Sequence, residues 1–281
     1  MAGAFKRFAQ FNGSLRTGLS RLYTNTKTNP FELLKPYYPL IPKQRISTGD
    51  TKTDLNYVSV SKIVACCGSI RTKPDIVLRT SHLVLERMTI GRKVHKEFEN
   101  ILTDFSKSRQ IERCNDEIIN SIVDEKQNVE ESVRAYVAGF LPFLRENLVF
   151  DSCMLMEKKV VHNGLGIRGK FDAICSLAGE GRMLVDVKTI STESELAGET
   201  ELCGFAMQLA SYVGSVNADP AYNRLGPIKK AAVVLLYPSQ PPKMIVLGEE
   251  ELQVFWIVSQ RYNWIYRMKK GIWIPQDVLC T

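Results

Sequence analysis

The chain of 281 residues lacks the patterns that mark membrane proteins, zinc proteins and disulfide scaffolds. No apolar run approaches the roughly 18 residues that a membrane-spanning helix needs. Seven cysteines are present, but none forms a CxxC pair, so the sequence predicts no zinc site and favours reduced, mostly buried thiols. With 44% hydrophobic and 24% charged residues, the composition is typical of a globular protein.

Acidic residues are missing from the first 31 residues, which carry Lys6, Arg7, Arg16, Arg21 and Lys27. A basic, hydroxyl-rich, amphipathic start is typical of a mitochondrial presequence. We therefore expect removal of residues 1–23 and a location in the mitochondrial matrix; the alternative is a basic tail that binds nucleic acid or membrane. Removal lowers the net charge from +7 to +3, so the overall charge is weak evidence for nucleic-acid binding.

The order of predicted elements indicates an α/β protein. After the presequence we expect an extended Pro/Tyr-rich arm (24–57), a helical region (58–150), an α/β core (151–270) and a C-terminal tail (271–281). Periodicity predicts helices over 81–105, 112–128, 129–146, 198–216 and 249–269, and a short helix after Tyr57. It predicts strands over 154–161, 171–177, 183–189, 231–237 and 244–247.

The strands 171–177 and 183–189 read as a β-hairpin, because the loop between them contains Gly179 and Gly181. In a hairpin centred near Gly179, residues whose numbers sum to about 358 face each other. Asp172 and Asp186 then lie opposite each other, with Cβ atoms roughly 5 Å apart.

Lys188 shares the face of the two acids, because side chains alternate along a strand. The hairpin residues expected to point the other way, into a core, are Phe171, Ala173, Val185 and Val187. Opposed carboxylates repel, and a hard cation such as Mg²⁺ removes this repulsion. The alternative is a solvent-exposed face whose acids are neutralised by Lys170 and Lys188.

Residues elsewhere in the chain bear on this choice. His95 borders the apolar stripe of its helix and is either a ligand for Mn²⁺-type cations or an ordinary helical histidine. Gln208 and Tyr212, four residues apart on a helix, either contact phosphate and the lysine or form a simple polar–aromatic pair. Glu157 is an extra ligand or, as we prefer, an exposed strand charge.

Five short motifs occur in a fixed order between about residues 38 and 270: Ser59-Val-Ser61, Gly91-xxx-His95, Gly169-xx-Asp172, Asp186-Val-Lys188 and Gln208-xxx-Tyr212. In this order they resemble the RecB-type nucleases of the PD-(D/E)xK superfamily. The likeness is greatest to the mitochondrial members, which share Asp186 where Glu is commoner. The resemblance implies a restriction-endonuclease-like core, with a mixed central sheet flanked by helices and an N-terminal helical region.

The resemblance also implies an activity: a metal-dependent exonuclease that hydrolyses single-stranded DNA, including flap ends, in mitochondrial DNA replication and maintenance. Mg²⁺ or Mn²⁺ would be held by His95, Asp172, Asp186 and the carbonyl of Val187, and Lys188 would orient water or stabilise charge on phosphate. Gln208 and Tyr212 would support Lys188 and the DNA backbone. The alternatives are a mitochondrial RNA or mixed-substrate nuclease and a catalytically inactive nucleic-acid-binding module.

Further partners follow from residue type. A single strand needs basic and aromatic contacts, and the candidates are Lys43, Arg45, Lys62, Arg92, Lys93, Tyr37, Tyr38 and Tyr57; an ordinary solvated surface is the alternative.

Ser59 and Ser61 bind phosphate or, more simply, cap a helix. Some RecB-type relatives carry an iron–sulfur cluster on one upstream and three downstream cysteines. Here Cys66 or Cys67 could supply the first, but only Cys280 lies near the C-terminus, so we expect no cluster. We expect a monomer that contacts mitochondrial replication proteins and no membrane.

Overall fold

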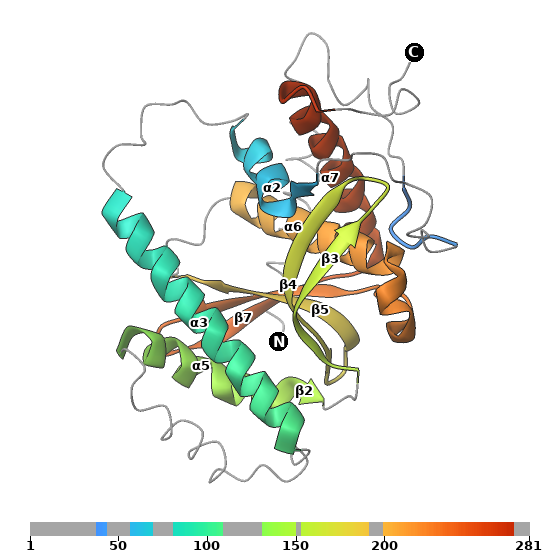
Figure 1. Ribbon diagram of the computed structural model, residues 1–281. Helices are drawn as coiled ribbons and strands as arrows, with labels where there is room; N and C mark the ends of the chain where they lie inside the picture. The colour runs from blue at the N-terminus through green and yellow to red at the C-terminus, as the bar shows by residue number, and fades with distance from the viewer. Residues whose placement is uncertain are drawn as a thin grey trace.

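A computed structural model of the chain describes residues 38–43, 57–69, 81–108, 131–149, 153–190 and 199–272. These residues form a mixed seven-stranded sheet with helices on both faces, which confirms the predicted fold class (Figure 1). Within these ranges, no helix combines the length and apolarity needed to cross a membrane. The predicted presequence, the helix over 112–128 and most of the arm lie outside the described residues.

The central sheet has the strand order β1, β4, β5, β6, β7, and β2 and β3 also pair with β4. The strands are β1 (Val58–Ser59), β2 (Leu148–Val149), β3 (Leu155–His162), β4 (Ile167–Leu177), β5 (Gly181–Thr189), β6 (Ala231–Tyr237) and β7 (Gln240–Leu247). The pairs β1·β4 and β5·β6 are parallel, and the other pairs are antiparallel. A parallel pair needs a long crossover, and the chain between β5 and β6 includes α6.

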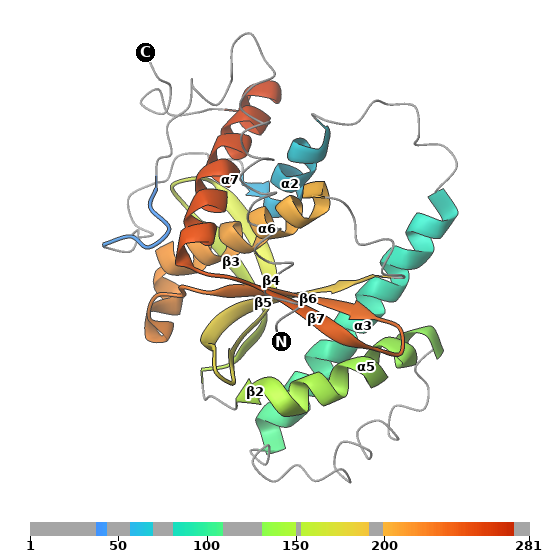
Figure 2. The ribbon, with the colours of Figure 1, turned by 180° about the vertical axis from the view of Figure 1, so that it is seen from behind.

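Helices cover both faces of the sheet. They are α2 (Val60–Ser69), α3 (Ser81–Ser108), α5 (Glu131–Asn147), α6 (Glu199–Ala218) and α7 (Glu249–Lys269), with a 3₁₀ turn, η4 (Pro220–Leu225). One apolar cluster joins the sheet to α2, α6 and α7, and a second joins it to α3 and α5. Figure 2 shows the same layers from behind, with the β6–β7 hairpin between them.

Most predicted elements are confirmed, and β6 and α7 have the predicted bounds. β6 is buried along all seven residues, as expected of a central strand. β7 begins at Gln240 rather than at the expected residue 244. Pro241 and Pro242 suggest a break in the sequence, but proline is tolerated on an edge strand, where its missing N–H costs no ladder bond.

One predicted orientation in the hairpin is wrong. Ala173, Val185 and Val187 belong to the cluster on the α3–α5 face, but Phe171 packs in the opposite cluster, where its ring contacts Tyr222. Across the sheet from this point, Glu157 of β3 has a φ of 51°. None of the described β3–β4 pairs joins Glu157 and Asp172, so the ladder is interrupted between Phe171 and Ala173, where the alternation along β4 breaks.

His162 is a buried histidine that should make the fold acid-sensitive. It is 1% exposed, its ring packs against Tyr38 and Trp256, and its Nδ1 accepts the N–H of Leu165 at 3.1 Å. Burial lowers the pKa of His162 from 6.5 to about 3. Between these two values the unfolded chain binds more protons than the folded one, so stability falls as the pH falls.

The replacement His162→Asn tests this linkage, because Asn keeps a side-chain acceptor but does not titrate. Each pKa unit corresponds to about 1.4 kcal/mol. Between pH 7 and pH 4.5 the wild type should lose about 2–3 kcal/mol more free energy of unfolding than the variant. Urea unfolding at the two pH values measures the difference, and equal losses in both proteins would contradict it.

Candidate active site

Asp172 and Asp186 lie where β4 and β5 separate, just beyond the pair Ala173↔Val185; we call this place the fork. Pairing between β4 and β5 runs from Leu177↔Gly181 to Ala173↔Val185, and these numbers sum to 358, as predicted. Beyond Ala173, β4 continues alongside β3, whereas β5 continues alongside β6. Asp172 and Asp186 are therefore the first residues past the end of the shared ladder.

The fork leaves a gap along one edge of β4. β3 pairs with one edge of β4 from Ile167 to Ile174. β1 and β5 therefore both pair with the opposite edge of β4, and the gap lies between them. β1 pairs with residues 167–168 and β5 with residues 173–177. In the described sheet no strand pairs with residues 169–172 on this edge, so Gly169 and Asp172 face the space between β1 and β5.

Asp172 is fixed by two donors at the fork. Its Oδ2 accepts the N–H of Val187 at 2.7 Å and lies 3.3 Å from Nδ1 of His95. Val187 follows the end of the ladder, so the carboxylate takes an N–H where β4 and β5 have separated. His95 extends from the middle of α3. Its contact with Asp172 brings two of the predicted metal ligands together.

Asp186 is paired with the predicted catalytic lysine. Nζ of Lys188 lies 2.6 Å from Oδ2 of Asp186, and the Asp186 side chain is 2% exposed. The same ammonium lies 5.6 Å from the ring centre of Phe205 on α6. An aromatic face attracts a cation and shields it from water, so Phe205 helps to place the lysine.

The pKa values of Asp172 and Asp186 are shifted in opposite directions. Burial raises the pKa of Asp186, and the ammonium of Lys188 only partly offsets this effect. Burial also acts to raise the pKa of Asp172, but the hydrogen bond and charge of His95 outweigh it, so this pKa is lowered. Neighbouring acids whose pKa values are pushed apart are typical of functional sites.

The pKa values of the two bases, His95 and Lys188, are both raised. Burial acts to lower the pKa of His95, but the hydrogen bond and charge of Asp172 outweigh it and raise the pKa overall. Burial likewise acts to lower the pKa of Lys188, and the charges of Asp186 and Asp172 raise it overall. Lys188 therefore stays an ammonium ion in a mostly dry setting.

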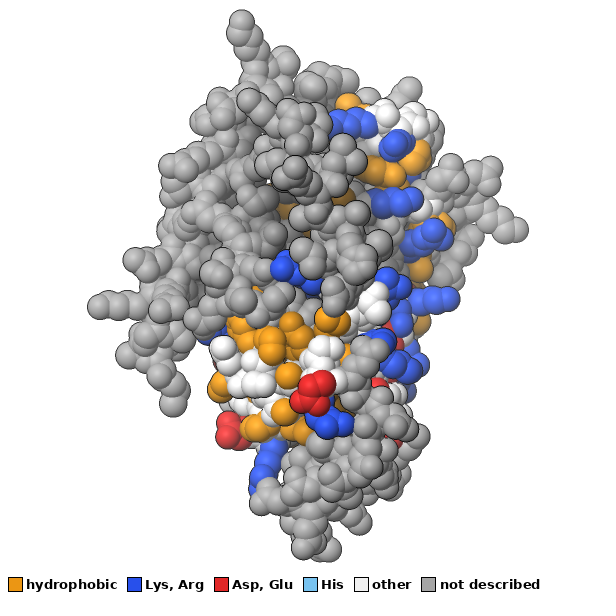
Figure 3. Space-filling model, turned by 90° about the vertical axis from the view of Figure 1, so that its left-hand side faces the viewer, with side chains coloured by type: hydrophobic (Ala, Val, Ile, Leu, Met, Phe, Trp, Pro, Cys, Tyr) orange, Lys and Arg blue, Asp and Glu red, His pale blue; other side chains and the backbone are white. Residues whose placement is uncertain are grey.

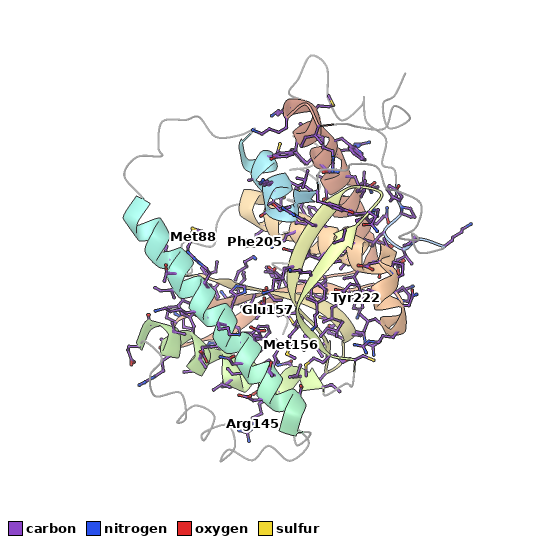
Figure 4. All side chains as sticks on the ribbon, in the orientation of Figure 1. Met88, Arg145, Met156, Glu157, Phe205 and Tyr222 are labelled. Carbon is purple, nitrogen blue, oxygen red and sulfur yellow. The ribbon has the colours of Figure 1, made fainter. Side chains whose placement is uncertain are left out.

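A group that could hold a metal ion includes Glu157, which we expected to be an exposed strand charge. Ligand atoms of His95, Glu157 and Asp172 all lie within 4.8 Å of one another. The Glu157 side chain is only 14% exposed, so the preferred interpretation from sequence is wrong. Figure 4 shows Glu157 on β3 beside the middle of α3. A nitrogen and two carboxylates suit Mn²⁺ or Mg²⁺.

Gln208 and Tyr212 form a pair on α6. Nε2 of Gln208 donates to Oη of Tyr212 at 3.0 Å. Burial raises the pKa of Tyr212, and the charges of Asp186 and Asp172 add to the rise. The simple helix pair is thus present, and the predicted contacts with Lys188 and DNA remain predictions.

Gly169 gives Tyr212 its place at the site. A Cβ atom at Gly169 would lie 2.4 Å from Cε1 of Tyr212 and 3.3 Å from Cγ2 of Val60. Only a residue without a side chain lets the ring lie against the unpaired edge of β4. The first residue of the Gly169-xx-Asp172 motif therefore has a packing role.

We expect Gly169→Ala to lower the free energy of unfolding by about 1–3 kcal/mol, as overpacking does in a filled core. In a Tyr212→Leu background, which removes the ring, the same replacement should cost less than half as much. Thermal and urea unfolding of the four proteins measure both costs. An equal cost in the two backgrounds would show that the ring is not the obstacle.

The remaining predicted residues are Ser59, Ser61, Arg92 and Val187. Ser59 ends β1 and immediately precedes α2, as a capping residue would, and its hydroxyl lies 3.1 Å from that of Ser61. Arg92 is exposed on α3 and donates to the carbonyl of Met88. The structure shows the N–H of Val187 on Asp172, and the role of its carbonyl as a ligand stays a prediction.

A band of basic side chains borders the site. Figure 3 shows Lys and Arg along its right-hand edge, which corresponds to the front of Figure 1, where α3, β3 and β4 lie. The exposed basic residues of these elements and of α2 include Lys62, Arg92, Lys93, Lys96, Lys158, Lys159, Arg168 and Lys170. Lys62, Arg92 and Lys93 were predicted from sequence, but the contribution of β3 and β4 was missed.

The aromatic residues predicted to contact DNA differ in their burial. Tyr38 packs against His162, and its backbone bonds to Gln260 and Trp256, so it belongs to the core. Tyr57 is 41% exposed and donates to Asn163. Tyr37 and Arg45 lie outside the described residues.

Comparisons with known proteins assign neither a family nor a function to the chain. No family model matches the chain, and no curated protein matches its sequence. The solved structure of SSO0001 is similar at 16% identity, over 78% of this chain and 78% of that chain, with a TM-score of 0.34. A candidate exonuclease from Eubacterium rectale is similar at 14% identity, over 83% of this chain and 89% of that chain, with a TM-score of 0.43. Neither likeness is close enough to assign a function.

Proposed function

We propose that this protein is a metal-dependent exonuclease that hydrolyses single-stranded DNA, including flap ends, in mitochondrial DNA maintenance. The observation that carries the proposal is the fork, where Asp172, Asp186, Lys188 and His95 converge from three elements. A binding module needs no buried acids, because phosphate binding favours cations alone. Burial of two carboxylates is costly unless cations compensate it. By its motif order, the protein resembles the mitochondrial genome maintenance exonuclease.

The chain's own residues supply most of the reaction's requirements. Asp172, Asp186 and His95 would hold the cation. Ligand atoms of Glu157, His95 and Asp172 lie within 4.8 Å of one another, so Glu157 is within reach of a cation bound by His95 and Asp172. When bound, a divalent cation supplies Lewis acidity, which activates water and withdraws charge from the phosphate. Lys188, an ammonium ion beside Asp186, donates a hydrogen bond to the attacking water or to a phosphate oxygen. His95 and the N–H of Val187 keep Asp172 in place.

The preference for single strands rests on the surroundings of the fork. Exposed basic residues of α3, β3 and β4 flank it, and Phe205 lies beside Lys188. Basic side chains follow a phosphate backbone, and aromatic side chains stack with unpaired bases. The mitochondrial setting rests on the sequence of residues 1–23.

Digestion of labelled strands tests the function. The purified protein, lacking residues 1–23, is incubated with matched DNA and RNA strands, with duplex DNA and with a flap, in Mn²⁺, Mg²⁺ or EDTA. We expect stepwise shortening of single-stranded DNA and of the flap with either cation and none in EDTA. Strands blocked at the 5′ or 3′ end reveal the direction of digestion.

The outcomes separate the alternatives. Equal digestion of RNA would replace the proposal with a mixed-substrate nuclease. Binding of DNA without cleavage in Mn²⁺ would replace it with an inactive binding module. Import of the full chain into isolated mitochondria, followed by loss of the first residues, tests the location independently.

A further inference from the structure

Glu157 differs from its neighbours on β3 in ways that suggest a specific role. Lys158 and Lys159 are exposed, but the Glu157 side chain is only 14% exposed. Its backbone has a φ of 51°, a conformation that is unfavourable for residues other than glycine. Strained backbone of this kind persists where the surrounding structure requires it, and it clusters at functional sites.

The position of the Glu157 carboxylate fits a cation shared with His95 and Asp172. Mn²⁺ and Mg²⁺ hold their ligands at roughly 2.1 Å, so two ligands of one ion lie at most about 4.2 Å apart. The ligand atoms of the three residues lie within 4.8 Å of one another, so a small inward movement would let them share one ion. The three residues come from α3, β3 and β4, and the flanking pairs Met156↔Ala173 and Lys158↔Phe171 place Glu157 level with Asp172.

A lysine already neutralises this carboxylate. The ammonium group of Lys170 pairs with Oε2 of Glu157, and the Lys170 side chain is 54% exposed. The same carboxylate oxygen cannot bind both a divalent cation and an ammonium group without sharing its charge. The Lys170 end of this ion pair is exposed, so its ammonium group can move into water when a divalent cation binds the carboxylate.

We propose that Glu157 is a third carboxylate ligand of the catalytic cation and that Lys170 neutralises this carboxylate until the cation binds. Cation binding then releases the Lys170 ammonium to the basic band, where it contacts phosphate. The inference deepens the proposed function and rests on its cation site. When the cation binds, the basic band that contacts DNA therefore gains one unpaired positive charge.

Direct titration with Mn²⁺ tests the exchange without any substrate. Calorimetry, or the loss of the free-Mn²⁺ spin-resonance signal, gives the affinity of the wild type and of single variants. Glu157→Gln should weaken Mn²⁺ binding by about tenfold or more, the effect of losing a residue that supports a metal site. Lys170→Met should strengthen Mn²⁺ binding about threefold to fivefold, because the competing ion pair is lost.

The matched control is Lys159→Met. Lys159 is the cross-strand partner of Lys170, and its replacement by Met also removes one positive charge. Its affinity should rise less than that of Lys170→Met. In the double variant Glu157→Gln/Lys170→Met, the strengthening should fall to the level of the control. Circular dichroism confirms that each variant is folded.

The outcomes separate the two proposals. A wild type that binds Mn²⁺ and cleaves DNA, with unchanged affinity in Glu157→Gln, would overturn the ligand role alone. Equal effects of Lys170→Met and Lys159→Met would overturn the exchange. A wild type that neither binds Mn²⁺ nor cleaves DNA would overturn both proposals.

Discussion

Lys188→Met should lower the rate of single-strand cleavage by about 10²–10³-fold, the usual effect of removing one donor that stabilises charge in a transition state. Methionine keeps the length and apolar character of the side chain, so packing against Phe205 should survive. The lysine is not an expected metal ligand. The Mn²⁺ affinity should therefore not fall, and it should rise, because a cation beside Asp186 has been removed.

Single-turnover cleavage at saturating Mn²⁺ measures this loss, and calorimetry measures the affinity. Lys243→Met is the control, because Lys243 lies on the edge strand β7 beside Tyr237 and should leave cleavage unchanged. Undiminished cleavage by Lys188→Met would remove the assignment of this site as the hydrolytic centre. A matching loss of Mn²⁺ binding would instead give Lys188 a role in building the site.

Asp172 should have two separable roles, one in the fold and one in the reaction. Asp172→Ala leaves the buried N–H of Val187 without its carboxylate acceptor, which should lower the free energy of unfolding by about 1–3 kcal/mol. Asp172→Asn keeps an oxygen acceptor at that position and should recover most of this loss. Both variants should cleave DNA at least about 10²-fold more slowly, because both lose the negative charge that would hold the cation.

Urea unfolding in EDTA compares the two variants without any contribution from a bound cation. Addition of Mn²⁺ should then raise the unfolding midpoint of the wild type, because a ligand that binds only the folded state stabilises it. Neither variant should show the full rise. Equal stabilities of Asp172→Ala and Asp172→Asn would show that the bond to Val187 contributes little to folding.

The sequence predicts much of the fold because its patterns are local. The two glycines in the turn set the register of the hairpin, so the pairing of Ala173 with Val185 could be worked out in advance. The continuous apolar run over 231–237 identified a strand buried on both faces. β1 and β2 were missed because each has only two residues, too few for any periodicity.

The candidate site was only partly predictable, because its geometry depends on contacts between distant segments. The position of His95 beside Asp172 came from motif order, and no local pattern places α3 against the fork. Glu157 was misjudged because its strand reads as alternating and charged, and its left-handed backbone has no signal such as glycine. A half-buried charge next to two exposed lysines could not be recognised without the tertiary structure.

The fork between β4 and β5 also bears on when the site can form during folding. Both acids lie on the local β4–β5 hairpin, but Asp186 also pairs with Val233 of β6, which lies beyond the α6 crossover. Parallel pairs between distant segments form slowly, because a long loop must close first. We expect an incompletely folded chain to have its hairpin but no ordered position for Asp186. Nuclease activity would then appear only with the last stage of folding, which limits the damage that a misfolded copy could do to nucleic acid.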